Sequence, residues 1–65
     1  MFVRGDDFRR WRFENRVKLY PIAKHCGCSL AYISRFENEQ ITINDYTIEK
    51  YKEFINKYEK GEVKI

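Results

Sequence analysis

The chain has few of the residues that stabilise or shape a small fold by means other than a hydrophobic core, such as cysteines in disulfides and prolines or glycines in turns. Among its 65 residues are two cysteines, one proline and three glycines. The cysteines, Cys26 and Cys28, are one residue apart, which excludes an unstrained disulfide between them. A chain of this length buries only about 60% of its unfolded surface. We therefore expect one domain over residues 1–65 with a thin core, for which a 17% aromatic content supplies large side chains.

The chain also lacks the features of membrane, secreted and catalytic proteins. No apolar run is long enough for a membrane span, and the first residues show no signal-peptide pattern. There is one histidine and no set of nucleophile, base and carboxylate. The segment His25–Cys28 has too few ligands for a closed zinc site, and its cysteines suit buried apolar positions. We expect a soluble cytoplasmic protein that is not an enzyme, with no cofactor, metal, membrane partner or small-molecule substrate.

The charge is unevenly distributed along the chain. The net charge is +3, but residues 1–35 hold eight basic residues against three acids, whereas residues 36–65 hold five lysines against seven acids. The first part is thus +5 and the second −2. A basic surface suits nucleic acid, because neutralising phosphates supplies most non-specific affinity. The alternative is a solvated surface whose asymmetry has no function.

Turn-forming residues divide the first part of the chain into two expected helices. Asp6 or Asp7 can cap a helix that ends near Arg16. Three residues share its inward face: Phe8, Trp11 and Arg12. A proline suits the first turn of a second helix, Pro21–Cys26, which should stop at Gly27.

Two further helices complete a predicted compact all-α, four-helix domain. Ser29 caps a third helix that runs from Leu30 to about Asn38, and Asn44 caps a fourth that ends near Gly61. The fourth helix carries an apolar stripe of Ile48, Tyr51, Phe54, Ile55 and Tyr58. Alternating apolar residues in the terminal arms allow extended structure at Phe2 and Val3 and at Val63 and Ile65.

The stretch 19–38 has the pattern of a helix, a sharp turn and a helix. A small residue in the first helix, Gly27 in the turn and Ser29 opening the second allow two helices to cross closely at a steep angle. This combination is typical of the helix-turn-helix of DNA-binding proteins.

The helix 30–38 has two different faces at 100° per residue. Ile33 and Phe36 lie on one side, and Glu37 lies at its edge. The opposite side carries no acid and consists of Leu30, Ala31, Ser34, Arg35 and Asn38. One side can anchor the helix while the other enters a groove.

Each residue of that free side has a DNA-contacting interpretation and an ordinary surface one. An arginine on a groove-facing helix is the commonest specific reader of guanine, which favours Arg35. Leu30 and Ala31 can pack on a thymine methyl group. Ser34 and Asn38 can reach bases or phosphates, and the Ser29 hydroxyl can cap the helix and also touch a phosphate.

Residues 12–38 resemble the lambda-repressor/Cro (Xre-like) family of helix-turn-helix domains. The pattern consists of Arg12, Ile22-Ala23, Gly27, Ser29, Tyr32-Ile33-Ser34-Arg35 and Phe36-Glu37-Asn38. The resemblance implies a recognition helix in the major groove. It places Leu30, Ala31, Ser34 and Arg35 over bases, and Ser29, Asn38 and the Lys18–Tyr20 segment near the backbone. It also implies a buried Arg12–Glu37 ion pair, with which their opposite charges at the edge of an apolar face agree; the alternative is two unrelated surface charges.

The chain departs from the family in two places. Family members often have a glutamine that holds a phosphate where Leu19 and Tyr20 stand here, so Lys18, Lys24 or backbone amides would replace it. The family usually has five helices and this chain is expected to have four, so the fourth helix or the Val63–Ile65 tail would supply a dimer surface.

The resemblance implies sequence-specific binding of double-stranded DNA by a small transcriptional regulator. Such a protein would act as a homodimer on a palindromic operator, as repressors of phages and mobile elements do. The alternative is a protein-interaction module on the same fold, such as an antirepressor, a host-defence inhibitor or a phage accessory factor. RNA binding is less favoured, because no stacking platform of surface aromatics is evident.

Overall fold

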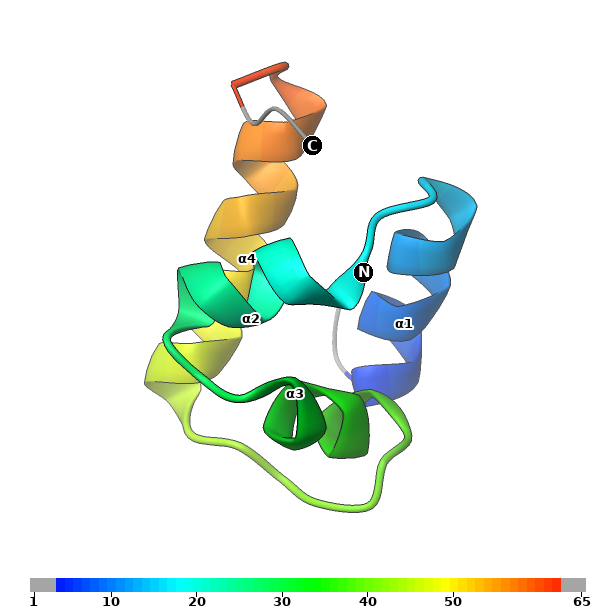
Figure 1. The fold of residues 1–65 in the computed structure, drawn as a ribbon, viewed down its shortest axis with the longest axis vertical. Helices are drawn as coiled ribbons and strands as arrows, with labels where there is room; N and C mark the ends of the chain where they lie inside the picture. Colours follow the sequence, from blue (N-terminus) through cyan, green and yellow to red (C-terminus); the bar gives the residue numbers. More distant parts are fainter. Residues whose placement is uncertain (1–3, 63–65) are drawn as a thin grey trace.

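The computed structural model describes residues 4–62, and this part of the chain folds into four α-helices without a strand (Figure 1). They are α1 (Gly5–Glu14), α2 (Leu19–Cys26), α3 (Leu30–Glu37) and α4 (Asp45–Glu59). The all-α prediction with four helices is confirmed. The predicted extended arms at Phe2 and Val3 and at Val63 and Ile65 lie outside the described residues. Within residues 4–62, no helix combines the length and apolar character needed to cross a membrane.

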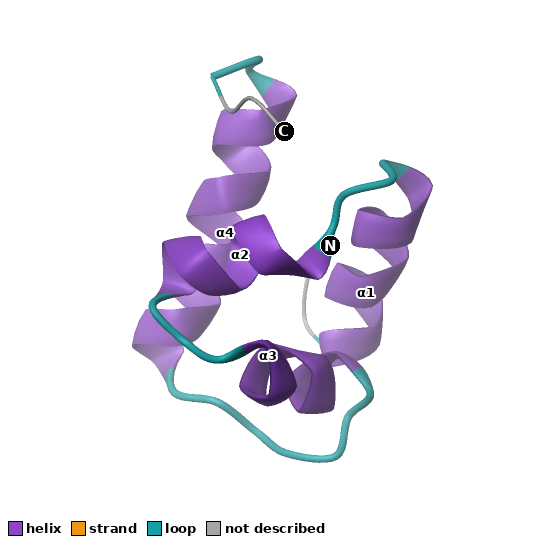
Figure 2. Ribbon diagram, viewed as in Figure 1, coloured by secondary structure: helices purple, strands orange, loops and turns teal. Residues whose placement is uncertain are grey.

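The helices lie in two layers. Figure 2 shows α2 and α3 in front, with α1 and α4 behind them on either side. The closest helix pairs are α2 with α4, α1 with α3, and α2 with α3.

An aromatic cluster at the centre joins α1, α3 and α4. The ring of Phe8 lies 4.6 Å from that of Tyr51 and 5.4 Å from that of Phe36, measured between centroids. The remaining buried hydrophobic side chains are Trp11, Val17, Ile22, Ala23, Cys26, Ile33, Phe54 and Ile55. The predicted inward faces of the first and fourth helices are therefore largely confirmed.

Two of the predicted N-caps are present and one is wrong. Ser29 Oγ accepts the Tyr32 N–H at 3.1 Å, and Asn44 Oδ1 accepts the Thr47 N–H at 2.8 Å. For α1, the N-cap is Arg4 and not an aspartate. Asp7 acts from the third helical position instead, where its carboxylate accepts the Arg4 backbone N–H at 3.0 Å.

The start of α2 also differs from the prediction. The helix begins at Leu19, two residues before Pro21. The proline is the third helical residue, and the first four backbone N–H groups of a helix have no acceptor within it. Its missing N–H therefore costs no helical hydrogen bond, and the extra residues extend α2 toward α1.

Each of the four helices is followed, within two residues, by one in the left-handed region. Gly27 (φ 72°) and Gly61 (φ 76°) follow α2 and α4, as predicted, and Arg16 (φ 57°) and Glu39 (φ 60°) follow α1 and α3. Two backbone hydrogen bonds close each end; after α1 they run from Arg16 to the carbonyl of Phe13 and from Val17 to that of Arg12. The turn begins before Arg16, so α1 ends at Glu14, slightly earlier than expected.

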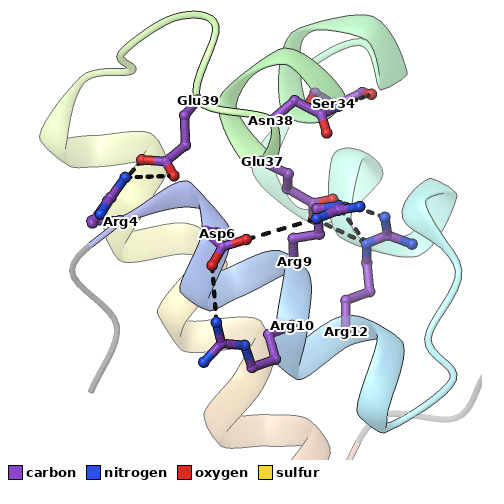
Figure 3. A network of polar contacts seen from close by, with 9 residues as sticks. All are labelled: Arg4, Asp6, Arg9, Arg10, Arg12, Ser34, Glu37, Asn38 and Glu39. Atoms are coloured by element: carbon purple, nitrogen blue, oxygen red, sulfur yellow. Dashed lines mark hydrogen bonds and ion pairs between the residues drawn. The ribbon is translucent and has the colours of Figure 1, made fainter.

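Gly5 allows α1 and α3 to approach closely. A β-carbon at this buried position would overlap the Phe36 carbonyl group. Arg4 beside it forms two 2.8 Å hydrogen bonds to the Glu39 carboxylate just after α3 (Figure 3). The start of α1 is thus held directly against the end of α3.

Candidate nucleic-acid interface

The face of α3 that points away from the other helices is the candidate interface. Leu30 is 47% exposed, and Ala31, Arg35 and Asn38 are also exposed, while Ser34 is half-buried. On the opposite side, Ile33 is fully buried and Phe36 is 6% exposed. The two predicted faces of this helix are therefore present. We call Leu30, Ala31, Ser34, Arg35 and Asn38 the outer face of α3.

A buried polar cluster holds the other side of α3. Arg12 and Glu37 form the ion pair that the resemblance implied, with Nη2 and Oε1 2.8 Å apart and side chains 13% and 1% exposed (Figure 3). Arg12 Nε donates to both carboxylate oxygens, at 3.1 and 2.9 Å, and Nη1 donates to the Val17 carbonyl at 3.2 Å. The Tyr51 hydroxyl donates to Glu37 Oε2. The tyrosine was predicted only as an apolar residue, since its helical spacing carries no sign of a polar partner.

Burial and charge shift the ionisation of this cluster. Burial lowers the pKa of Arg12, but the hydrogen bond and charge of Glu37 outweigh it and raise this pKa above its usual value. Burial and the Glu37 carboxylate raise the pKa of Tyr51 well above its usual range. Arg12 therefore stays charged and Tyr51 stays protonated, so both remain donors to Glu37.

Two polar residues of the outer face hydrogen-bond with each other. The amide nitrogen of Asn38 donates to the Ser34 carbonyl at 2.9 Å and lies 3.5 Å from Ser34 Oγ (Figure 3). The amide oxygen of Asn38 has no hydrogen-bond donor among the described residues. Arg35 forms neither an ion pair nor a hydrogen bond through its side chain within residues 4–62.

The cations around α2 and α3 are not neutralised by the fold. Residues 15–36 contain no acid. Lys18, Lys24 and Arg35 are exposed and form no ion pair within the described part of the chain. By contrast, the arginines of α1 and its N-cap are paired with acids: Arg4 with Glu39, Arg9 and Arg10 with Asp6, and Arg12 with Glu37. Within the described residues, the basic residues of the first half that form no ion pair are therefore Arg16, the N-cap Lys18 and Lys24 of α2, and Arg35 on the outer face of α3.

One contact that holds α2 in place has no signal in the sequence. His25 Nε2 lies 2.8 Å from Glu53 Oε1, which joins α2 to α4 across 28 residues of chain. The His25 ring also packs edge-on against Phe54 at 5.8 Å. This contact fixes α2 on α4 and with it the position of the turn before α3.

The cysteines at the turn contribute to packing. Cys26 is buried with its Sγ 3.9 Å from the Thr47 carbonyl, and Cys28 packs against the same core at its edge. Burial raises the pKa of the Cys26 thiol to about 11, so the free thiol stays protonated at neutral pH. Residues 4–62 contain no group of three or more histidine, cysteine or acidic side chains that could hold a metal ion.

Comparison with known proteins identifies no relative: the chain matches no protein-family model, no curated protein and no solved structure. We therefore infer the function from the geometry of α2 and α3. These helices are joined by residues 27–29, lie within a four-helix fold, and leave one face of α3 exposed, with the unpaired Arg35 on it.

Proposed function

We propose that this chain is a helix-turn-helix protein that binds double-stranded DNA sequence-specifically as a small transcriptional regulator. The observation that carries the proposal is the outer face of α3, which is exposed and free of acids and carries the unpaired Arg35, with Lys18 and Lys24 exposed and unpaired on the preceding helix. Phosphates next to a major groove repel carboxylates and attract cations, so this is the charge pattern that a groove-facing helix needs.

The dimensions of α3 support the same proposal. Its 8 residues span about 12 Å, comparable to the width of the major groove. With α3 in the groove, Arg35 contacts guanine, and Lys18, Lys24 and Ser29 lie toward the phosphates. The Arg12–Glu37–Tyr51 cluster holds the helix from behind, which limits the entropy lost when the complex forms.

Regulation would follow from occupancy of a promoter. A homodimer would place two copies of α3 about 34–36 Å apart, on half-sites one turn of DNA apart. An operator of this kind overlapping a promoter would exclude polymerase. Bound sequences selected from a random duplex pool should then contain an inverted repeat with this spacing.

The test is a duplex titration at several salt concentrations, read by fluorescence anisotropy. We expect Arg35→Ala to weaken binding to a selected duplex by roughly 5- to 150-fold, the range of a lost bidentate base contact. The matched control is Lys57→Ala, which removes one cation from the last turn of α4, at the other end of the molecule from α3 (Figure 1). Lys24→Ala should weaken binding to all duplexes alike and reduce the slope of log affinity against log salt by about 0.9.

The result that would contradict the proposal is an absence of duplex binding at low salt by the folded protein. An effect of Lys57→Ala equal to that of Arg35→Ala would contradict the placement of α3. The competing function, a protein-interaction module on the same fold, would give weak binding that none of these substitutions changes. A partner recovered by pull-down would then depend on exposed aromatics such as Tyr20 and Tyr46, which are 62% and 67% exposed.

A further inference from the structure

The outer face of α3 carries apolar as well as polar side chains with which it could read bases. Two of its five residues, Leu30 and Ala31, are apolar and exposed in the first turn of the helix. An exposed leucine side chain gains nothing from contact with water. In a major groove, the apolar group available to it is the 5-methyl group of thymine.

The polar pair on the same face is poorly arranged for reading adenine. Bidentate recognition of adenine by asparagine requires one amide N–H for N7 and the amide oxygen for the N6 amino group. In Asn38 the amide nitrogen donates to the Ser34 carbonyl at 2.9 Å and lies 3.5 Å from Ser34 Oγ, so it is already engaged with Ser34. Reading adenine in this way would compete with the contacts that the Asn38 amide makes to Ser34.

Arg35 is the remaining side chain with strong hydrogen-bonding capacity. It lies four residues after Ala31, which places the two on the same row of the helix, about 6 Å apart along its axis. Successive bases of one strand rise by 3.4 Å, so this separation corresponds to roughly two base-pair steps.

From these contacts we infer that Leu30 and Ala31 are specificity-determining residues that recognise the 5-methyl group of thymine, within about two or three base pairs of a guanine read by Arg35. The inference rests on the proposed DNA-binding function and adds to it the chemistry of the site that is bound. Such a contact also determines how the protein binds DNA with modified cytosines. Because an apolar side chain detects the methyl group and not the base edge, 5-methylcytosine in place of that thymine keeps the contact, whereas cytosine loses it.

The experiment uses the full chain and duplexes selected from a random-sequence pool. Each selected duplex is prepared again with deoxyuridine in place of thymidine, which removes the methyl groups and leaves base pairing unchanged. We expect the affinity of the unmodified protein to fall about fourfold for each methyl group contacted, the value for one buried carbon group. For Leu30→Ala, the ratio of thymine to uracil affinities should move toward one.

Controls separate this contact from general effects of the modified DNA. Tyr46→Ala removes an exposed aromatic side chain from α4 and should keep the full thymine-to-uracil ratio. A third duplex series, with 5-methylcytosine or cytosine at the methyl-sensitive position, should bind better when methylated. The circular dichroism of Leu30→Ala should match that of the unmodified protein, because the side chain is largely outside the core.

The possible failures are distinguishable. If the protein binds selected duplexes tightly but shows the same affinity for thymine and uracil versions, the methyl inference is wrong and the proposed function stands. An equal thymine-to-uracil ratio in Leu30→Ala and the unmodified protein also overturns it, because the sensitivity would then come from DNA shape. If no duplex is bound, both the inference and the proposed function fail.

Discussion

The position of α3 on the other helices depends most directly on one residue, Glu37. Its carboxylate is 1% exposed and accepts hydrogen bonds from Arg12 and Tyr51, so one side chain links α3 to both α1 and α4. A buried charge of this kind is tolerated only when its partners are complete. Glu37 therefore contributes to the orientation of α3 as well as to the stability of the fold.

Replacing Glu37 should be severely destabilising. In Glu37→Ala, the Arg12 charge loses its partner and the Tyr51 hydroxyl loses its acceptor, which should lower the free energy of unfolding by about 3–5 kcal/mol. Urea denaturation followed by circular dichroism measures this change. The matched control is the triple variant Arg12→Met, Glu37→Leu, Tyr51→Phe, in which no buried polar side chain is left unpaired. It should recover most of the lost stability, and an unaltered midpoint for Glu37→Ala would contradict this account.

At the scale of the helices, stability depends on how each one ends. The turns after α2 and α4 use glycine in the left-handed region, where a β-carbon is costly, but the turns after α1 and α3 use Arg16 and Glu39. Glu39 has a compensating role, since it binds Arg4. Arg16 forms no ion pair within residues 4–62, so its side chain brings no such gain.

Arg16→Gly should therefore stabilise the protein. Removal of the β-carbon from a residue at φ 57° relieves about 1 kcal/mol, which for a domain of this size raises the melting temperature by roughly 4–8 °C. Arg16→Ala is the control, because it removes the same charge but keeps the β-carbon, and its melting temperature should not rise. Equal melting temperatures for the two variants would show that the backbone conformation is not the cause.

A larger residue at Gly5, where α1 and α3 lie closest, should destabilise the protein. Gly5→Ala adds a methyl group that overlaps the Phe36 carbonyl, so α1 and α3 must separate. We expect a loss of about 1–3 kcal/mol in the free energy of unfolding, as for other overpacked sites, despite the higher helix propensity of alanine. Glu14→Ala, at an exposed position near the other end of α1, should change stability little. A stabilised Gly5→Ala variant would mean that the helices do not meet at this glycine.

At the scale of the whole molecule, the contact between His25 of α2 and Glu53 of α4 joins the two layers and responds to pH. The hydrogen bond from His25 and the charge of Lys50 hold the pKa of Glu53 below its usual value of 4.5. A carboxylate with a lowered pKa stabilises the fold above its unfolded pKa, and this contribution is lost as the pH falls through the folded one.

Glu53→Gln should accordingly be less stable than the unmodified protein above about pH 4.5, with a difference that shrinks at lower pH. Melting temperatures measured from neutral to acidic pH test this. Glu49→Gln serves as a comparison on the same helix, since its ion pair with Lys52 is longer, at 3.9 Å, and its carboxylate is 74% exposed. A gap between Glu53→Gln and the unmodified protein that stays constant below pH 4 would contradict the assignment.

Much of this molecule could be predicted from its sequence because the signals are local. Apolar spacing, Ser29 and Asn44 as caps and Gly27 and Gly61 as stops predict the helices, because each acts within one or two turns of chain. The same periodicity predicts which side of α3 is buried. The errors fall at the ends of elements: Asp7 caps from inside α1, and Pro21 tolerates two helical residues before it.

Only the tertiary structure decided how the helices are held together and where the charge is left unpaired. Tyr51 donates to Glu37, His25 contacts Glu53, and Gly5 lies against Phe36, each pair separated by 14 to 31 positions along the chain. No local pattern reports such a pairing, because it depends on how whole helices cross. The sequence by itself determined a basic half and an acid-free helix face. Folding paired the arginines of α1 and its N-cap with acids and left Arg16, Lys18, Lys24 and Arg35 without an ion pair within the described residues.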